Sequence, residues 1–226
     1  MDTSLQVISR NIPFLLDAAG YTATVSGAGM IIGLVLGTAL CIAKVSGTTT
    51  LQHTVGLYIS LFRGIPLLVQ ILALFYLLPH IGIDLPALAC AILSVGLCAA
   101  AYNAEILRSA VQSIPHGQVE AAYATGMTRI TLWRRILLPQ AVRIGLPSLV
   151  NELVLLIKAS SLASVIGIAE LTRTAQNIAG QTYRHFEIYV TAGALYLLLS
   201  LIIATAGRMA EKHLLTPYTG RGTSGR

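Results

Sequence analysis

The chain has 226 residues, of which 55% are hydrophobic and only 11% charged, and its mean hydropathy is +0.74. This composition lies outside the range of soluble globular proteins and indicates a membrane protein. We therefore predict an all-α fold: a polytopic membrane protein of about five transmembrane helices, in a single domain that covers 1–226.

Residues 1–20 hold Asp2, Arg10 and Asp17 and lack a continuous apolar core, so they are not typical of a signal peptide. We expect them to form an extracytoplasmic amino-terminal segment. The first predicted span, Tyr21–Ala43, would then have to direct insertion into the membrane.

Glycines line one face of this first span, because Gly29, Gly33 and Gly37 recur at every fourth position. Such a face lets two membrane helices approach each other closely. Packing within one helix bundle and a contact seam with a second chain both fit this pattern.

Four further apolar runs follow, and about 20 residues of helix are needed to cross the hydrocarbon core. The candidate spans are Ile65–Leu78, Leu85–Leu107, Ile144–Ile166 and Ile188–Ala206. The first of these is short, and the segment before it, Leu51–Phe62, is expected to be an interfacial helix. Pro66 disfavours helix at the preceding residue, so we predict a kink at 63–66.

Lysine and arginine are distributed unevenly between the two sides of these spans. An outside amino terminus leaves Arg10, Arg173 and Arg184 outside and Lys158 within a span, and puts the rest of the 15 basic residues on the cytoplasmic side. The positive-inside rule therefore predicts this orientation, with a cytoplasmic tail at 207–226. The net charge of +6 is then a signal of topology, and no nucleic-acid partner is expected.

A polar loop, 109–143, separates the third and fourth spans. Pro115 and Gly117 end the third span, and Gln118–Thr125 is typical of a short helix. Glu120 is expected in the first turn of that helix, where the helix dipole favours a carboxylate.

The residues after Glu120 suit contact with another protein. Ala121 and Ala122 offer a flat surface, Gly126 would let the chain turn, and Thr128 would cap a second helix. We expect this second helix to lie at the membrane surface on an apolar side made of Ile130, Trp133, Ile136 and Leu137. An ordinary amphipathic loop without a partner is the alternative.

The longer pattern of this loop resembles the EAA loop of ATP-binding-cassette importers: Glu120-Ala121-Ala122, then Gly126, then Leu138-Pro139. Further segments resemble, in order, the polar amino-acid permeases of that class. They are 63–70 (RGIPLLVQ), 101–108 (AYNAEILR), 138–143 (LPQAVR), 151–152 (NE) and 158–162 (KASSL). The opening run at 11–37 is most similar to the cystine-type permeases.

Membership of this family would make the chain the permease subunit of a type I importer. The resemblance implies that Gly117, Glu120, Ala121, Ala122, Gly126 and Pro139 couple it to a separate ATPase. It implies two copies of that ATPase, which would bind ATP and Mg, an extracytoplasmic solute-binding protein, and a second permease chain in a homodimer or a heterodimer. The expected location is the bacterial inner membrane, and the expected cargo is a polar amino acid, with cystine as a candidate.

The fourth span brings charge into the bilayer. A charge at the bilayer centre costs about 2.5–3.5 kcal/mol, so Glu152 and Lys158 should face protein or water. They match the two charges of a zwitterionic amino acid, although an internal salt bridge or an outward-reaching Lys158 also fits. The predicted substrate pathway consists of Gln70, Asn151, Glu152, Lys158, Ser160 and Ser161.

Two positions depart from the family pattern. Ile65 replaces the usual threonine, and Ala159 stands where many members carry aspartate. The absence of an acid at Ala159 weakens the case for a lysine or arginine substrate.

The predicted extracytoplasmic loop, 167–187, is polar and has few long apolar runs. It is a natural docking surface for a solute-binding protein, or else a solvated loop. Catalytic and metal-binding patterns are lacking: the three cysteines have no paired spacing and the five histidines are scattered. We therefore predict no catalytic residue, no metal site, no cofactor bound by this chain and no enzyme activity. A stand-alone channel or secondary carrier is the alternative function.

Overall fold

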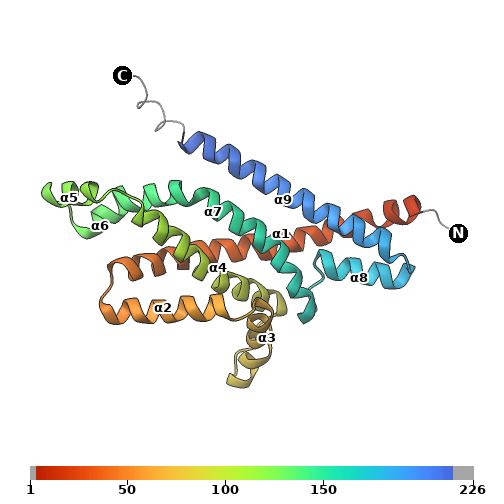
Figure 1. The fold of residues 1–226 in the computed structure, drawn as a ribbon. Helices are drawn as coiled ribbons and strands as arrows, with labels where there is room; N and C mark the ends of the chain where they lie inside the picture. Colours follow the sequence, from red (N-terminus) through yellow and green to blue (C-terminus); the bar gives the residue numbers. More distant parts are fainter. Residues whose placement is uncertain (1–3, 216–226) are drawn as a thin grey trace, which may run out of the picture.

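The structure, a computed structural model, describes residues 4–215, which form an elongated helical bundle without a strand (Figure 1). The all-α prediction is confirmed. The helices in chain order are α1 (Ser4–Ser46), α2 (Thr49–Gly64), α3 (Leu67–Leu77), η1 (Leu78–Ile81), α4 (Ala87–Gln112), α5 (His116–Ala124), α6 (Arg129–Leu132), the π-helical η2 (Trp133–Leu137), α7 (Leu138–Ala159), η3 (Ser160–Ile166), α8 (Leu171–Thr182) and α9 (His185–Leu215).

Four helical stretches are long and apolar enough to cross a membrane, and the bent pair α2–α3 makes a fifth if it counts as one span. This agrees with the five predicted spans. The stretch that contains the predicted fourth span is much longer than expected, because helix continues from Arg129 to Ile166. The separate surface helix predicted after Thr128 is therefore wrong.

A π-helical turn joins α6 to α7. The amide of Leu138 bonds to the carbonyl of Trp133, so the turn takes in one more residue than an α-helical turn. Pro139 has no amide proton and lies in the first turn of α7, where none is needed. The proline is thus accommodated without breaking the helix.

The glycines of α1 pack against α4 within the bundle. A Cβ atom added at Gly29, Gly33 or Gly37 would lie 2.5, 2.6 or 2.8 Å from the nearest atom of α4, respectively. Only a residue without a side chain allows the two helices to come this close. Of the two interpretations of the glycine face, the structure shows the first.

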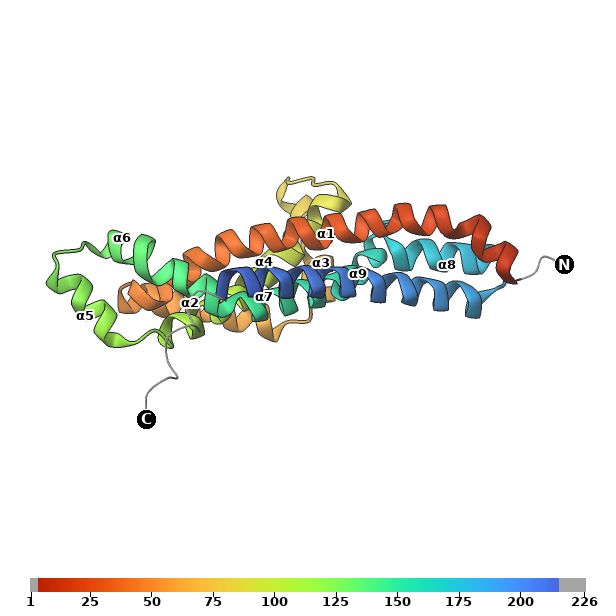
Figure 2. The same cartoon turned by 90° about the horizontal axis from the view of Figure 1, so that it is seen from above.

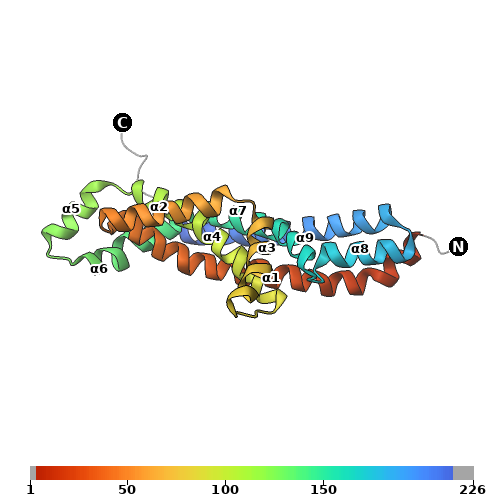
Figure 3. The same ribbon diagram turned by 90° about the horizontal axis from the view of Figure 1, so that it is seen from below.

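The predicted break at 63–66 is present, and α2 and α3 meet there at an angle of 103°. The predicted interfacial helix is wrong, however, because α2 runs alongside α1 and α4 while α3 turns across them (Figures 1 and 3). Val55 and Ile59 are buried, and the hydroxyl of Tyr58 donates to the carbonyl of Leu97 at 2.8 Å. These contacts hold α2 inside the bundle.

The end of the bundle where α1 begins is a three-helix unit of α1, α8 and α9 (Figure 2). The predicted amino-terminal segment is helical from Ser4 onward and continuous with the first span, and the first three residues lie outside the described residues. The buried Val7 and Leu15 of this segment pack against α8 and the start of α9. The partners that complete this small core are Leu171, Ala175, Ile178, Ala179, Ile188 and Ala192.

The predicted loop 167–187 contains the amphipathic helix α8. Glu170 caps this helix, because its carboxylate accepts from the amides of Thr172 at 2.9 Å and Arg173 at 2.8 Å. The hydroxyl of Tyr196 donates to the same carboxylate at 2.7 Å, and Glu170 is fully buried. Glu170 therefore holds α8 in place and is not part of an exposed surface.

Candidate functional site

Two regions of the bundle carry the predicted functional residues. The first is the end with α5 and α6, toward which α9 also runs, opposite to the start of α1 (Figures 1 and 3). The second is a cavity between α4 and α7. Both regions are formed by helices that pack against the core described above.

Helix α5 presents one face outward and buries the other. Glu120 and Ala121 are exposed, whereas Ala122 is only 3% exposed and packs into the main core. A Cβ atom added at Gly117 would lie more than 4 Å from the neighbouring described atoms. Because α5 begins at His116, Glu120 falls in its second turn. The prediction that Glu120 lies in the first turn is therefore wrong.

The chain reverses after α5 through a left-handed glycine. Gly126 has φ +78°, and the amides of Gly126 and Met127 bond to the carbonyls of Tyr123 at 2.9 Å and Ala122 at 3.0 Å. This pair of bonds defines a Schellman motif, for which glycine is the preferred residue. Thr128 then caps α6 by accepting from the amide of Thr131 at 3.3 Å, as predicted.

Three side-chain contacts connect this region to the spanning helices. The amide of Gln140 donates to Gln118 at 2.8 Å, which joins α7 to α5. The indole of Trp133 donates to the hydroxyl of Ser46 at 2.8 Å, and Arg129 donates to the carbonyl of Ser46 at the end of α1. A displacement of α5 would therefore reach α7 through Gln118, whereas the end of α1 is tied to α6 and η2.

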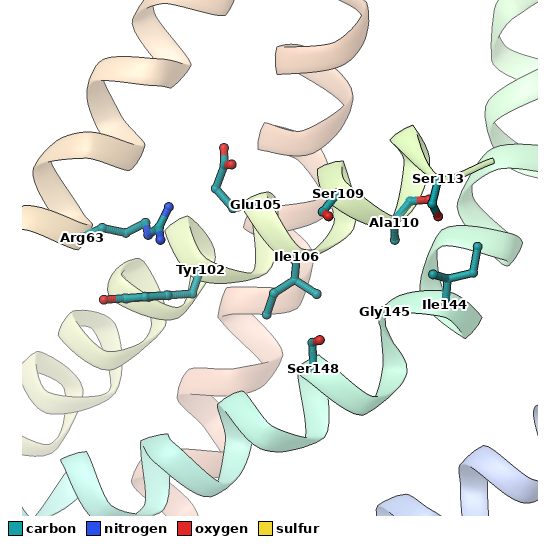
Figure 4. Close-up of a pocket in the computed structure, with 10 residues that line it drawn as sticks. All are labelled: Arg63, Tyr102, Glu105, Ile106, Ser109, Ala110, Ser113, Ile144, Gly145 and Ser148. Atoms are coloured by element: carbon teal, nitrogen blue, oxygen red, sulfur yellow. The ribbon is translucent and has the colours of Figure 1, made fainter. Parts of the chain in front are cut away.

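The cavity between α4 and α7 has a volume of about 470 Å³ and is lined by both polar and apolar residues (Figure 4). Arg63 reaches it from the end of α2. The other lining residues are Tyr102, Glu105, Ile106, Ser109, Ala110 and Ser113 of α4, and Ile144, Gly145 and Ser148 of α7. Arg63, which the sequence analysis counted among the basic residues of the cytoplasmic side, is exposed and lies at the end of α2.

Charges at the cavity are paired. Glu105 contacts Arg108 at 2.7 Å and Lys44 of α1 at 3.4 Å. The guanidinium of Arg63 lies over the ring of Tyr102, 5.1 Å from its centroid. A cation over an aromatic face is stabilised by the negative potential of the ring.

Two of the predicted pathway residues meet near Arg63. Glu152 is only 7% exposed and interacts electrostatically with Arg63 and Cys98. Gln70 neighbours Cys98 and donates to the carbonyls of Phe62 at 2.9 Å and Ile65 at 2.8 Å, at the break after α2. Among the described residues, the buried side-chain oxygen of Gln70 has no hydrogen-bond partner.

The other predicted pathway residues point elsewhere. Asn151 and Lys158 are exposed on another face of α7, and Lys158 forms no ion pair with Glu152 in the described part of the chain. Ser160 and Ser161 donate to carbonyls of their own helix, at Ile157 and Lys158. The structure thus brings Gln70 and Glu152 together and leaves the remaining four apart.

Sequence reasoning missed Ser109, Ser113 and Ser148 as cavity residues. The signal was present in α4, where Tyr102, Glu105 and Ser109 recur at helical spacing among small apolar residues. Over the described residues, no cluster of three side chains could hold a metal ion.

The sequence matches the family of binding-protein-dependent transport system inner membrane components over residues 29–215. The probable amino-acid ABC transporter permease protein YckA of Bacillus subtilis (strain 168) is 38% identical over 203 residues, covering 90% of each chain. The L-cystine transport system permease protein TcyB of the same organism is 35% identical over 203 residues, covering 89% of this chain and 87% of that protein.

A chain from the crystal structure of an amino acid ABC transporter with histidines has the same fold. It superimposes with a TM-score of 0.84 at 32% identity, covering 94% of this chain and 100% of that chain. The agreement therefore extends over sequence and fold alike.

Proposed function

Because this chain belongs to the family of binding-protein-dependent transport system inner membrane components, we propose that it is the membrane subunit of an ATP-driven amino-acid importer. It is an amino-acid ABC permease with several membrane spans. The proposal adds its partners: two copies of an ATPase, which bind ATP and Mg, an extracytoplasmic solute-binding protein and a second permease chain. The ATPase hydrolyses ATP, and this chain provides the pathway.

The observation that carries the proposal is the build of α5. A short helix that exposes Glu120 and Ala121 but anchors Ala122 in the core is suited to receive another protein and to pass on its movement. The Gln118–Gln140 bond leads from α5 to α7, which lines the cavity. A channel that works alone would have no use for such a helix.

The experiment changes Gly126 in the transporter reconstituted with its ATPase. Gly126→Pro cannot adopt φ +78°, because proline is fixed near −65°, so the turn after α5 is disrupted. We expect substrate-stimulated ATP hydrolysis to fall at least about tenfold, which corresponds to about 1.4 kcal/mol. The matched control is Gly126→Asn, because asparagine tolerates the left-handed region. Normal stimulation in Gly126→Pro would count heavily against the proposal.

The charged residues near the cavity fit a polar amino acid as the substrate. A zwitterion needs groups of both signs, and Arg63 and Glu152 place a cation and an anion close to the cavity. Ala159 supplies no second acid for a cationic side chain. The name of the relative TcyB adds L-cystine as a candidate for this chain. Competition of unlabelled cystine with uptake tests that candidate, and uptake that excess cystine leaves unchanged would exclude it.

The exposed face of α7 supports a second permease chain. Ser148, Asn151 and Lys158 are all exposed on this spanning helix, and such groups are costly against lipid. A partner chain or a water-filled pathway would cover them. A permease that stays monomeric when assembled with its ATPase would contradict this part of the proposal.

The proposed orientation puts α5 in the cytoplasm and the start of α1 outside, where α8 exposes Arg173, Gln176 and Asn177 to a solute-binding protein. It rests on the basic residues that gather at the α5 end, such as Arg129, Arg134 and Arg135. Labelling of a cysteine at Ser4 but not at Ser224 by an impermeant reagent in sealed cells is expected. The reverse pattern would overturn the orientation.

A further inference from the structure

The molecule has a second groove, apart from the cavity and from the exposed face of α5. It lies on the wall of the bundle, between the last two turns of α1, the start of α2 and the segment α6–η2. Its volume is about 590 Å³. Its lining residues are Ala39, Ile42, Ala43, Ser46, Gly47, Leu51, Arg129, Ile130, Trp133 and Arg134.

The floor and walls of this groove are apolar. Ile130 is 71% exposed and Leu51 is 44% exposed. The α1 wall is made of Ala39, Ile42 and Ala43, and the small side chains of the two alanines leave room for a chain of methylene groups. An exposed apolar trough of this kind is stabilised when hydrocarbon fills it.

The rim of the groove is positive. Arg129 and Arg134 are both exposed, and among the described residues neither guanidinium pairs with a carboxylate. The bond from Arg129 to the carbonyl of Ser46, and that from Trp133 to its hydroxyl, fix the two walls relative to each other. The groove therefore combines an apolar trough with two positive charges at its edge that have no carboxylate partner among the described residues.

We propose that this groove binds an anionic phospholipid of the membrane, with its phosphate between Arg129 and Arg134 and an acyl chain along Ala39 and Ala43. The depth is appropriate, because the groove lies at the last turns of a spanning helix, beside Lys44. A zwitterionic lipid would fill the trough, but the cation of its headgroup would offset the attraction between its phosphate and the arginines. Free phosphate would pair with the arginines but leave the trough empty. Charge and shape together select the anionic lipid.

The test is binding of phosphatidylglycerol to the full purified chain in a neutral detergent, followed by the shift of its thermal unfolding temperature. Specific binding to the folded state raises that temperature. Phosphatidylcholine with the same acyl chains and inorganic phosphate are the comparison ligands. We expect phosphatidylglycerol alone to stabilise the chain.

The variant Arg129→Gln with Arg134→Gln is expected to bind phosphatidylglycerol about ten- to thirtyfold more weakly. The matched control is Arg135→Gln with Arg143→Gln, which removes the same charge from exposed positions outside the groove and should bind normally. Ala39→Trp fills the trough from an exposed position, so it should also weaken binding while both arginines stay in place.

Equal stabilisation by phosphatidylglycerol and phosphatidylcholine would overturn the proposal, as would equal losses in the two double variants. Stabilisation by inorganic phosphate alone would assign the arginines to a free anion instead. Displacement of the lipid when the ATPase or a second permease chain assembles would assign the groove to that protein. Retention of the lipid on the assembled transporter supports the proposal.

Discussion

At the scale of single residues, Glu152 is the buried charge with the clearest relation to the pathway. It is 7% exposed, and Arg63 is the positively charged residue with which it interacts. A buried carboxylate that interacts with a cation of the cavity wall is stabilised by that cation but keeps the capacity to accept a hydrogen bond from a substrate ammonium group.

We predict that Glu152→Gln lowers transport by roughly ten- to a hundredfold, because a hydrogen bond to a charged group contributes about 1.5–3 kcal/mol. Assembly with the ATPase and basal hydrolysis should persist, because α5 lies elsewhere. The measurement is uptake into proteoliposomes with excess binding protein. Asp84→Asn, an exposed acid in the turn before α4, is the matched control. Equal uptake in both variants would give Glu152 a structural role only.

Helix geometry explains which of the predicted pathway residues could be located correctly from the sequence. Asn151 and Lys158 are seven residues apart and share a face, and the structure exposes both. Glu152 and Lys158 are six apart, which turns them about 120° from each other, so one side chain is buried and the other is not. The position of Arg63 at the cavity depends on the direction in which α2 runs, and no local sequence pattern encodes that direction.

At the scale of elements, the apolar runs gave the number and order of spans but not their ends. Hydropathy detects only the stretch that suits lipid, whereas helix continues as long as backbone hydrogen bonds do. This is why α1 begins at Ser4 and not at Tyr21. Helix α8 could have been found, because its apolar residues lie at i, i+4, i+7 and i+8 after an acidic cap.

The α1–α4 contact gives the element-scale prediction. Gly33→Ala would place a Cβ atom 2.6 Å from that of Ala99 and 3.1 Å from its backbone carbon, which no side-chain rotation relieves. We expect a loss of about 1–3 kcal/mol in the free energy of unfolding. Gly27→Ala is the matched control in the same helix, because a Cβ atom there meets nothing within 4 Å. Thermal unfolding of both variants in detergent measures the difference, and equal stabilities would contradict this packing.

At the scale of the whole molecule, the arrangement separates three tasks along one bundle. One end carries α5, and the other end is the unit of α1, α8 and α9 (Figures 1 and 2). The cavity lies between the second half of α4 and the first part of α7. The bond between Gln118 and Gln140 and the long helix from Arg129 to Ile166 link the α5 end to the cavity. In the proposed importer, movement at α5 would open or close the cavity.

The central claim is that this chain moves an amino acid only when a separate ATPase drives it. The most direct measurement is uptake of a labelled amino acid into proteoliposomes that contain the chain with or without the ATPase, binding protein outside and ATP inside. We predict uptake only when the ATPase, ATP and binding protein are all present. Uptake at the same rate by the chain alone would contradict the account and identify a channel or a secondary carrier.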